Sequence, residues 1–240
     1  MSIALEYKKT KRTGFLPAFL CGGILAGLVP VLDMVFRSEN YTHLSGSPFH
    51  ILLTADWQMA AMLNVLLIMI GACILYHTEH ADNGIQKMKT LPLTEYRLFW
   101  GKYCLLIGMY IIVLALEAAA FTFCILHWFD PYNGLGTDIL KGFSYVLVLS
   151  LPAILSSLIL ASVCRNMWTS LGIGAICIFL ATMLPTKNFI LSLFPFALPF
   201  QILSESPAEQ NRNYVIAAAI EFLILGITEL ILLKIRRSFE

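Results

Sequence analysis

The sequence predicts an all-α membrane protein with six transmembrane helices, and three observations support this class. Six apolar runs are each long enough to cross the roughly 30 Å hydrocarbon layer as a helix, which takes about 20 residues. The chain is 58% hydrophobic and only 13% charged. Basic residues are also concentrated in every second connection between the runs, which places them on one side of the membrane. The predicted spans are residues 14–36, 57–77, 98–129, 143–163, 167–184 and 214–235.

The distribution of Lys and Arg predicts that both termini are cytoplasmic, because basic residues concentrate in cytoplasmic segments. The connections on the side of the termini carry most of the basic residues, including the cluster Lys8, Lys9, Lys11 and Arg12. The opposite connections carry only four: Arg37, Lys141, Lys187 and Arg212. The spans use more than half of the 240 residues, so too little remains for a separate soluble catalytic domain, and residues 1–240 are interpreted as one domain.

The first span is predicted to be retained in the membrane. Its apolar stretch is about 23 residues long and lacks a small-residue cleavage site, whereas the apolar region of a signal peptide has roughly 7 to 15 residues. Residues 1–12, just before it, place apolar and basic side chains on different helical faces, which predicts a short helix in the cytoplasmic interface. A frayed basic tail is the alternative.

The outer connection before the last span is apolar but is predicted not to cross the membrane. Residues Phe189 to Leu203 contain Pro195 and Pro199, which interrupt a helix, and the segment is too short to span. We expect a re-entrant segment that enters the outer leaflet and returns, with its free backbone groups buried against protein.

The connection between the second and third spans is the candidate functional segment. It is the only cytoplasmic connection long enough to form a structured surface, and it is predicted to form a short helix near 82–89 and a corner at Pro92. Such an element can receive force from a soluble motor; an ordinary polar loop is the alternative. The candidate motor-coupling residues are Glu79, Asp82, Asn83, Gly84, Lys87, Lys89, Leu91 and Pro92.

Acidic residues at membrane depth are a second group of candidates. A carboxyl group there is costly and faces a cavity or a partner. Glu117 and Glu221 are therefore candidates for a translocation path for a cationic substrate. The alternative is that they are protonated, or hydrogen-bonded to Ser150, Ser156, Ser157 or Thr122, and join packed helices. Asp33 is expected to be an interfacial cap at the outer end of the first span.

Other motifs indicate packing rather than chemistry. Gly23 and Gly27 form a Gly-x-x-x-Gly pattern that permits close helix approach, either within the chain or between two subunits. The 6 cysteines include no C-x-x-C pair, and the string His77-Thr-Glu-His80 lacks the spacing of a zinc protease, so neither a disulfide framework nor a metal site is expected.

Several segments together resemble the small bacterial ABC exporter permeases, and are most similar to permease subunits of lantibiotic-immunity and bacitracin-type resistance transporters. These segments are ALEYKKTKRTGFLPAFL at the N-terminus, YHTEHADNGIQKMKTLPLTEYRLFWGK after the second span, and LALEAAAF in the third. The resemblance implies a multi-pass protein of the bacterial plasma membrane. It also implies a second six-span permease subunit, either a copy or a homologue, with separate ATP-binding subunits docking on the segment after span two.

The resemblance predicts that ATP and Mg²⁺ bind to the partner subunit and that this chain is not an enzyme. In agreement, the sequence has no Gly-x-x-x-x-Gly-Lys-[Ser/Thr] motif; Gly101-Lys102 is followed by Tyr103. The implied function is export of an antimicrobial peptide or another amphipathic, lipid-like substrate, for self-immunity or resistance. A membrane-embedded enzyme and a motor-independent carrier or sensor stay open as alternatives, although catalytic clusters and internal inverted repeats are not evident.

Overall fold

All regular secondary structure in the described part of the computed structural model is helical. It covers residues 7–11, 13–80, 95–130, 132–164, 166–184, 189–204 and 207–239. The long helices are α2 (Phe15–Thr42), α3 (Pro48–His80), α5 (Glu95–Trp128), α6 (Leu135–Val163), α7 (Met167–Met183) and α9 (Ala208–Phe239). The predicted all-α membrane class is confirmed, because five of these helices are long and apolar enough to cross a membrane. The sixth, α7, has 17 residues and is about 26 Å long.

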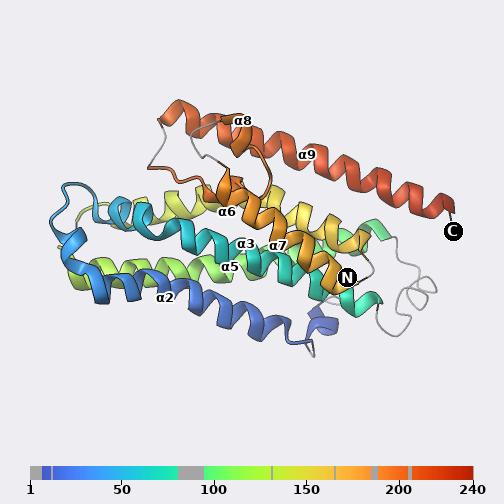
Figure 1. The fold of residues 1–240 in the computed structure, drawn as a ribbon, viewed down its shortest axis with the longest axis horizontal. Helices are drawn as coiled ribbons and strands as arrows, with labels where there is room; N and C mark the ends of the chain where they lie inside the picture. The colour runs from blue at the N-terminus through green and yellow to red at the C-terminus, as the bar shows by residue number, and fades with distance from the viewer. Residues whose placement is uncertain are drawn as a thin grey trace.

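The helices run roughly side by side as a bundle with α3 at its centre (Figure 1). Helix α3 packs against α2, α5, α6 and α7, whereas α9 packs mainly on α6. Helix α2 begins, α3 ends, α5 begins and α9 ends toward the same end of the bundle. We call this the inner end, because the basic residues predict it to be cytoplasmic, and the opposite end the outer end.

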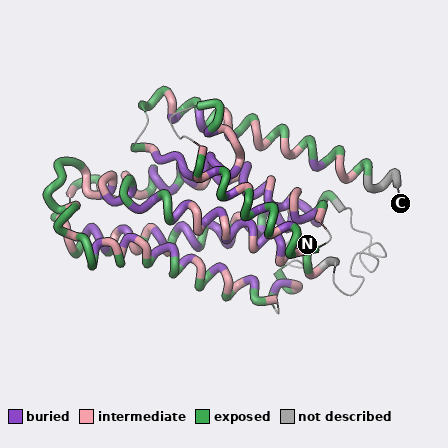
Figure 2. The backbone as a smooth tube through the Cα atoms, in the orientation of Figure 1, coloured by how far each residue is buried: buried purple, intermediate pink, exposed green. Residues whose placement is uncertain are grey.

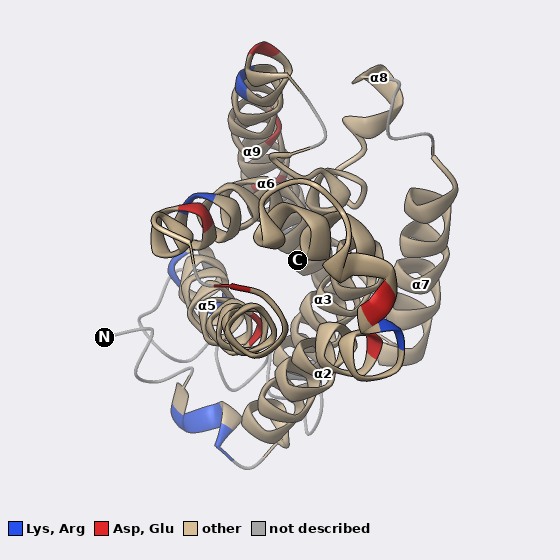
Figure 3. Ribbon diagram, turned by 90° about the vertical axis from the view of Figure 1, so that its left-hand side faces the viewer, with Lys and Arg blue, Asp and Glu red and all other residues tan. Residues whose placement is uncertain are grey.

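Burial divides the bundle into a packed centre and an apolar periphery. Figure 2 shows buried residues along α3 and α6 and exposed residues along most of α9. The exposed side chains of α9 are largely Ile and Leu, for example Ile220, Leu223 and Ile227. In the end-on view of Figure 3, charged residues are sparse on the helices. An apolar periphery with few charges suits contact with lipid.

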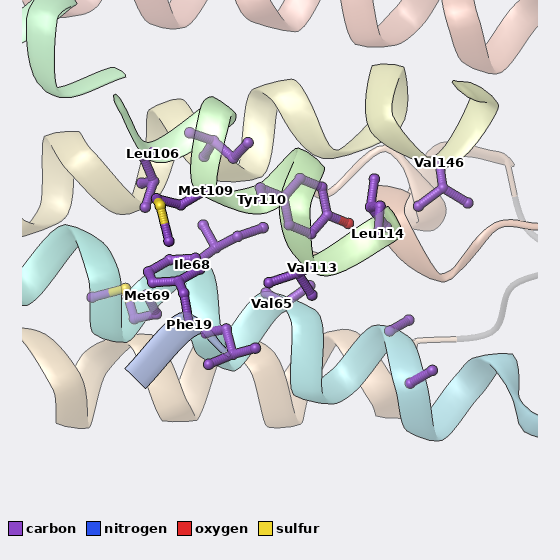
Figure 4. Packing of buried hydrophobic residues seen from close by; sticks show 14 of the residues in the cluster. Phe19, Val65, Ile68, Met69, Leu106, Met109, Tyr110, Val113, Leu114 and Val146 are labelled. Atoms are coloured by element: carbon purple, nitrogen blue, oxygen red, sulfur yellow. The ribbon is translucent and has the colours of Figure 1, made fainter. Parts of the chain in front are cut away.

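The core is built from large side chains that interlock between neighbouring helices. Figure 4 shows Val65 of α3 beside Val113 of α5. Toward the outer end, Phe49, Trp57, Phe121 and Phe143 form a cluster with ring centroids about 6 Å apart. This aromatic cluster joins α3, α5 and α6.

Four helices extend beyond the predicted spans at the outer end. Helix α2 reaches Thr42, but its backbone leaves the helical region at Arg37 (φ −136°, ψ 22°), next to the predicted end at residue 36. Helices α3, α6 and α9 begin at Pro48, Leu135 and Ala208, six to nine residues before the predicted starts. Hydropathy detects only apolar segments, while a helix continues through polar residues because its backbone hydrogen bonds are internal. Asp33 lies within α2, one turn before the break at Arg37, and Arg37 Nη1 is 3.6 Å from Asp33 Oδ1. Its role as an interfacial cap stays a prediction.

The segment between α7 and α9 folds back onto the bundle instead of crossing it. It contains α8 (Phe189–Ser192) and the short 3₁₀ helix η2 (Leu198–Phe200). The indole Nε1 of Trp57 donates a 3.0 Å hydrogen bond to the Pro199 carbonyl, and Leu198 is fully buried. The expected burial against protein is therefore observed for residues 196–202, whereas Phe189, Ile190 and Leu191 of α8 are exposed. Its depth in the membrane stays a prediction.

The predicted interfacial helix at residues 1–12 is described only in part. Residues 7–10 are helical, and Thr10 is buried, with its hydroxyl donating to the Tyr7 carbonyl at 2.9 Å. Gly14 follows with a φ of 75°, a conformation that favours glycine, and α2 starts at the next residue. The turn at Gly14 sets this short helix apart from α2.

Candidate functional site

A buried carboxyl–amide pair lies in the middle of the bundle. Asn64 of α3 donates a hydrogen bond from Nδ2 to Oε2 of Glu117 on α5, with a length of 3.0 Å. Both residues are fully buried. The other carboxyl oxygen of Glu117, Oε1, and the amide oxygen of Asn64, Oδ1, have no hydrogen-bond partner within the described structure. Buried polar atoms are usually paired, so two unpaired acceptors at one place indicate a site that another donor can satisfy.

Helix α2 approaches this pair closely because Gly27 has no side chain. A Cβ atom at Gly27 would lie 3.3 Å from the Cβ of Ala120 and 3.9 Å from the Cα of Glu117. One turn away, a Cβ at Gly23 would lie 3.0 Å from Leu116 Cδ1 and 3.4 Å from the Val113 backbone. The structure thus places both glycines of the Gly-x-x-x-Gly pattern against α5 of the same chain.

The hydroxyl groups named as alternative partners of Glu117 are engaged elsewhere or unpaired. Ser150 of α6 bonds the Tyr110 hydroxyl of α5 at 3.0 Å, as well as the Val146 carbonyl at 2.8 Å. Thr122 donates to the Ala118 carbonyl of its own helix at 2.7 Å. The buried oxygens of Ser156 and Ser157 have no hydrogen-bond partner among the described residues. The sequence analysis therefore missed Asn64, which is the actual hydrogen-bond partner of Glu117. An amide side chain in the middle of an apolar run was a signal for a hydrogen bond between helices.

Glu221 lies on the peripheral helix α9, apart from the Glu117 pair. It is partly buried, and its Oε2 has no hydrogen-bond partner in the described part of the chain. The adjacent Phe222 packs against Trp100 and Tyr103 of α5, with ring centroids 6.0 and 5.7 Å apart. Glu221 is thus held near α5, but no contact joins it to Glu117.

Most of the candidate motor-coupling segment lies outside the described residues. This holds for Asp82, Asn83, Gly84, Lys87, Lys89, Leu91 and Pro92, whose roles stay predictions. The backbone of Glu79 belongs to the last turn of α3. The segment therefore connects the end of α3 at His80 to the start of α5 at Glu95, at the inner end of the bundle.

Next to this connection, the inner end carries a buried cation. Lys102 of α5 is 1% exposed, and its Nζ lies 4.8 Å from the centre of the Tyr76 ring on α3. A cation over an aromatic ring is attracted by the ring's quadrupole. The burial of Lys102 was not predicted from the sequence, because it depends on the packing of α3 against α5.

An open pocket also lies at the inner end, with a volume of about 810 Å³. Its wall includes the C-terminal part of α3 and the start of α7, where Asn166 accepts a hydrogen bond from the Trp168 backbone nitrogen at 3.0 Å. The lining residues are Thr13, Ile74, His77, Thr78, Asn166, Met167 and Trp168. Neither Glu117 nor Glu221 lines it.

The described residues give no basis for metal chemistry. No group of three or more His, Cys, Asp or Glu side chains within them could hold a metal ion. Two pairs of buried polar groups, Asn64–Glu117 and Tyr110–Ser150, instead join one helix to another. Such an arrangement suits a bundle whose helices must be held in register within lipid.

The comparison with protein families gives a match over most of the chain. A family model described as ABC-2 family transporter protein matches residues 2–181, which include α2, α3, α5, α6 and nearly all of α7. No curated protein sequence and no solved structure matches the chain. A family member is the membrane component of an ABC transporter and has no ATPase site of its own. The chain therefore belongs to the ABC-2 transporter family, as a multi-pass permease component.

Proposed function

We propose that this chain is the permease subunit of an ATP-driven exporter in the bacterial plasma membrane, and that its substrate is a cationic antimicrobial peptide or another amphipathic, lipid-like molecule. The observation that carries the proposal is the family match over residues 2–181. It coincides with a helical bundle whose sequence lacks a nucleotide-binding motif. The work of transport then requires a separate ATP-binding subunit, which binds ATP and Mg²⁺.

The polar atoms of the bundle support a cationic substrate. Glu117 Oε1, Asn64 Oδ1 and Glu221 Oε2 are buried acceptors with no donor among the described residues. An ammonium or guanidinium group supplies only donors, so it could satisfy such acceptors during passage. Glu117 is enclosed in this conformation, so the path through it forms only when α3 and α5 separate.

The position of the inner connection supports the assignment of motor coupling. The segment joins α3, the central helix of the bundle, to α5, and these two helices carry the Asn64–Glu117 bond. A push on the connection would act directly on both helices. A second six-span permease, either a copy of this chain or a homologue, would complete the pathway.

Reconstitution tests the proposal. The purified chain, its ATP-binding subunit and any second permease are placed in proteoliposomes with a fluorescent cationic amphipathic peptide. We expect ATP-dependent peptide movement that is lost when the ATP-binding subunit is omitted or carries a disabled Walker lysine. ATP binding by the isolated chain at micromolar affinity, or transport without the motor, would contradict the proposal.

A further inference from the structure

The open pocket at the inner end of the bundle lies where three segments of the chain meet. Its wall combines the C-terminal part of α3, the start of α7 and Thr13, which lies just before α2. Its volume of about 810 Å³ is large enough for a polar headgroup with water around it. The segments that form it are far apart in the sequence, so a ligand in this pocket would connect them.

The length of α7 places the pocket near one surface of the membrane. Helix α7 has 17 residues and is about 26 Å long, slightly less than the roughly 30 Å hydrocarbon layer. Its first turn therefore lies close to the lipid headgroups. Trp168, in that turn, is 77% exposed, as is typical of aromatic residues at the interface. Further along α7, Ile176, Phe179 and Met183 are exposed and apolar, which suits contact with acyl chains.

The polar side chains of the pocket offer hydrogen-bond donors to a ligand. Asn166 Oδ1 accepts from the Trp168 backbone nitrogen at 3.0 Å, while its Nδ2 donates to no atom in the described structure. His77 is exposed, and an imidazole carries at least one N–H. The Thr13 and Thr78 hydroxyls donate to backbone carbonyls three residues earlier, at 2.9 Å each. The donors available to a ligand are thus on Asn166 and His77.

The charged residues around the pocket favour an anion. None of the residues that line it within the described structure is acidic. Lys8 and Lys11 are exposed on the short N-terminal segment that leads to the pocket. This segment is fixed to the pocket wall, because the Thr13 backbone nitrogen donates to the Thr10 carbonyl at 3.1 Å. Hydrogen bonds to an anionic oxygen are stronger than those between neutral groups.

We propose that this pocket binds the headgroup of an anionic phospholipid. The phosphate oxygens accept hydrogen bonds from Asn166 Nδ2 and His77, and the acyl chains lie along the exposed apolar side chains of α7. The bound lipid joins α3, α7 and the segment before α2 at the end of the bundle where α3 leads into the candidate coupling segment. This inference does not depend on which substrate the protein transports.

A lipid titration tests the site. The full-length protein in detergent is supplied with phosphatidylglycerol or phosphatidylcholine with the same acyl chains, and its thermal unfolding is followed. A ligand that binds only the folded state raises the melting temperature as its concentration increases. We expect a saturable rise with phosphatidylglycerol and a much smaller one with phosphatidylcholine. Soluble glycerol phosphate should have no effect, because it lacks the acyl chains.

Asn166→Asp locates the lipid. Aspartate keeps the N-cap of α7, since its carboxylate accepts from the Trp168 backbone nitrogen, but it removes the two amide donors and adds a negative charge. We expect the apparent affinity for phosphatidylglycerol to fall by about tenfold or more, and the melting temperature without lipid to stay close to that of the wild type. Asn40→Asp is the matched control: it adds the same charge at an exposed position near the outer end of α2 and should respond to phosphatidylglycerol as the wild type does.

Three results would overturn the proposal. Equal stabilisation by the two lipids would show that the headgroup charge is not recognised. Equal stabilisation by glycerol phosphate would identify a site for a soluble phosphate compound. An undiminished affinity of Asn166→Asp for phosphatidylglycerol would place the lipid elsewhere. If Asn166→Asp does not fold, Asn166→Ser takes its place, because serine keeps a cap acceptor without the amide donors; undiminished affinity of that variant would also overturn the proposal.

Discussion

Asn64 and Glu117 form a hydrogen bond of 3.0 Å between the centre of α3 and the centre of α5, and each keeps one unpaired oxygen. The bond fixes the relative height of two helices whose inner ends are joined by the candidate coupling segment. A movement of that segment along the bundle axis would have to strain or break it.

Substitutions of Glu117 separate a transport role from a packing role. We expect Glu117→Gln to keep the fold, because the glutamine carbonyl can still accept from Asn64, and to lower export of a cationic peptide. Glu117→Ala should cost about 1–3 kcal/mol of stability, since it leaves the Asn64 amide buried without a partner. Thermal unfolding in detergent and export by proteoliposomes give the two readouts. Unchanged export by Glu117→Gln would exclude a charged path at this position.

Enlarging Gly27 should loosen the contact between α2 and α5. Gly27→Leu places a side chain against Ala120 and the Glu117 backbone, and overpacking of this kind costs typically about 1–3 kcal/mol. Gly108→Ala is the control, because a Cβ there meets no atom within 4 Å. Replacing a helical glycine with alanine stabilises by up to about 1 kcal/mol. Equal melting temperatures for the two variants would contradict the close α2–α5 packing.

Removal of the Trp57 indole donor should release the outer segment. Trp57→Phe keeps an aromatic ring in the cluster but leaves the Pro199 carbonyl unpaired, at a cost of about 1–3 kcal/mol. We expect faster hydrogen exchange in residues 189–204 than in the wild type. Trp168→Phe, at a site that is 77% exposed, should leave exchange in that segment unchanged. If both variants match the wild type, the Trp57 bond does not hold the segment.

Changes in the coupling segment should separate ATP hydrolysis from transport. Charge reversal at Asp82 or Lys87, or Pro92→Ala, is expected to reduce export while the protein still inserts and folds. Solvated surface changes alter stability by no more than about 0.5 kcal/mol. Co-purification with the ATP-binding subunit and export are measured together. Normal co-purification with normal export would identify the segment as an ordinary loop.

The hydrogen bonds of Tyr132 predict that the protein loses folding stability in alkaline solution. Its hydroxyl donates to Asp138 at 2.8 Å and accepts from Ser47 at 3.0 Å, outside the spanning helices. Burial raises the pKa of Tyr132, an effect opposed by the Ser47 hydrogen bond and reinforced by Asp138. The stabilisation is therefore complete below the unfolded pKa of about 10 and is lost as the pH rises through the folded pKa.

The Tyr132→Phe variant isolates this contribution from those of the other tyrosines. The difference in unfolding free energy between wild type and variant should be constant below about pH 10 and shrink above it. Chemical unfolding at several pH values measures the difference. A difference that does not change with pH would show that the hydroxyl does not titrate as part of this network.

The sequence alone determined the class of the protein, the number and order of its apolar helices, and the interrupted segment before the last one. These features follow from local properties: the length of an apolar run and the two prolines at 195 and 199. Helix ends were predicted less well, because α3 and α6 continue through polar residues that hydropathy does not register.

Only the tertiary structure decided which residues meet. Glu117 was a candidate from its sequence position, but its partner Asn64 is 53 residues away and reaches it only because α3 packs against α5. The indole of Trp57 reaches the Pro199 carbonyl, 142 residues away, only because the folded-back segment packs against α3. Contacts of this kind depend on the rotation and relative height of packed helices, which the pattern of one segment does not contain.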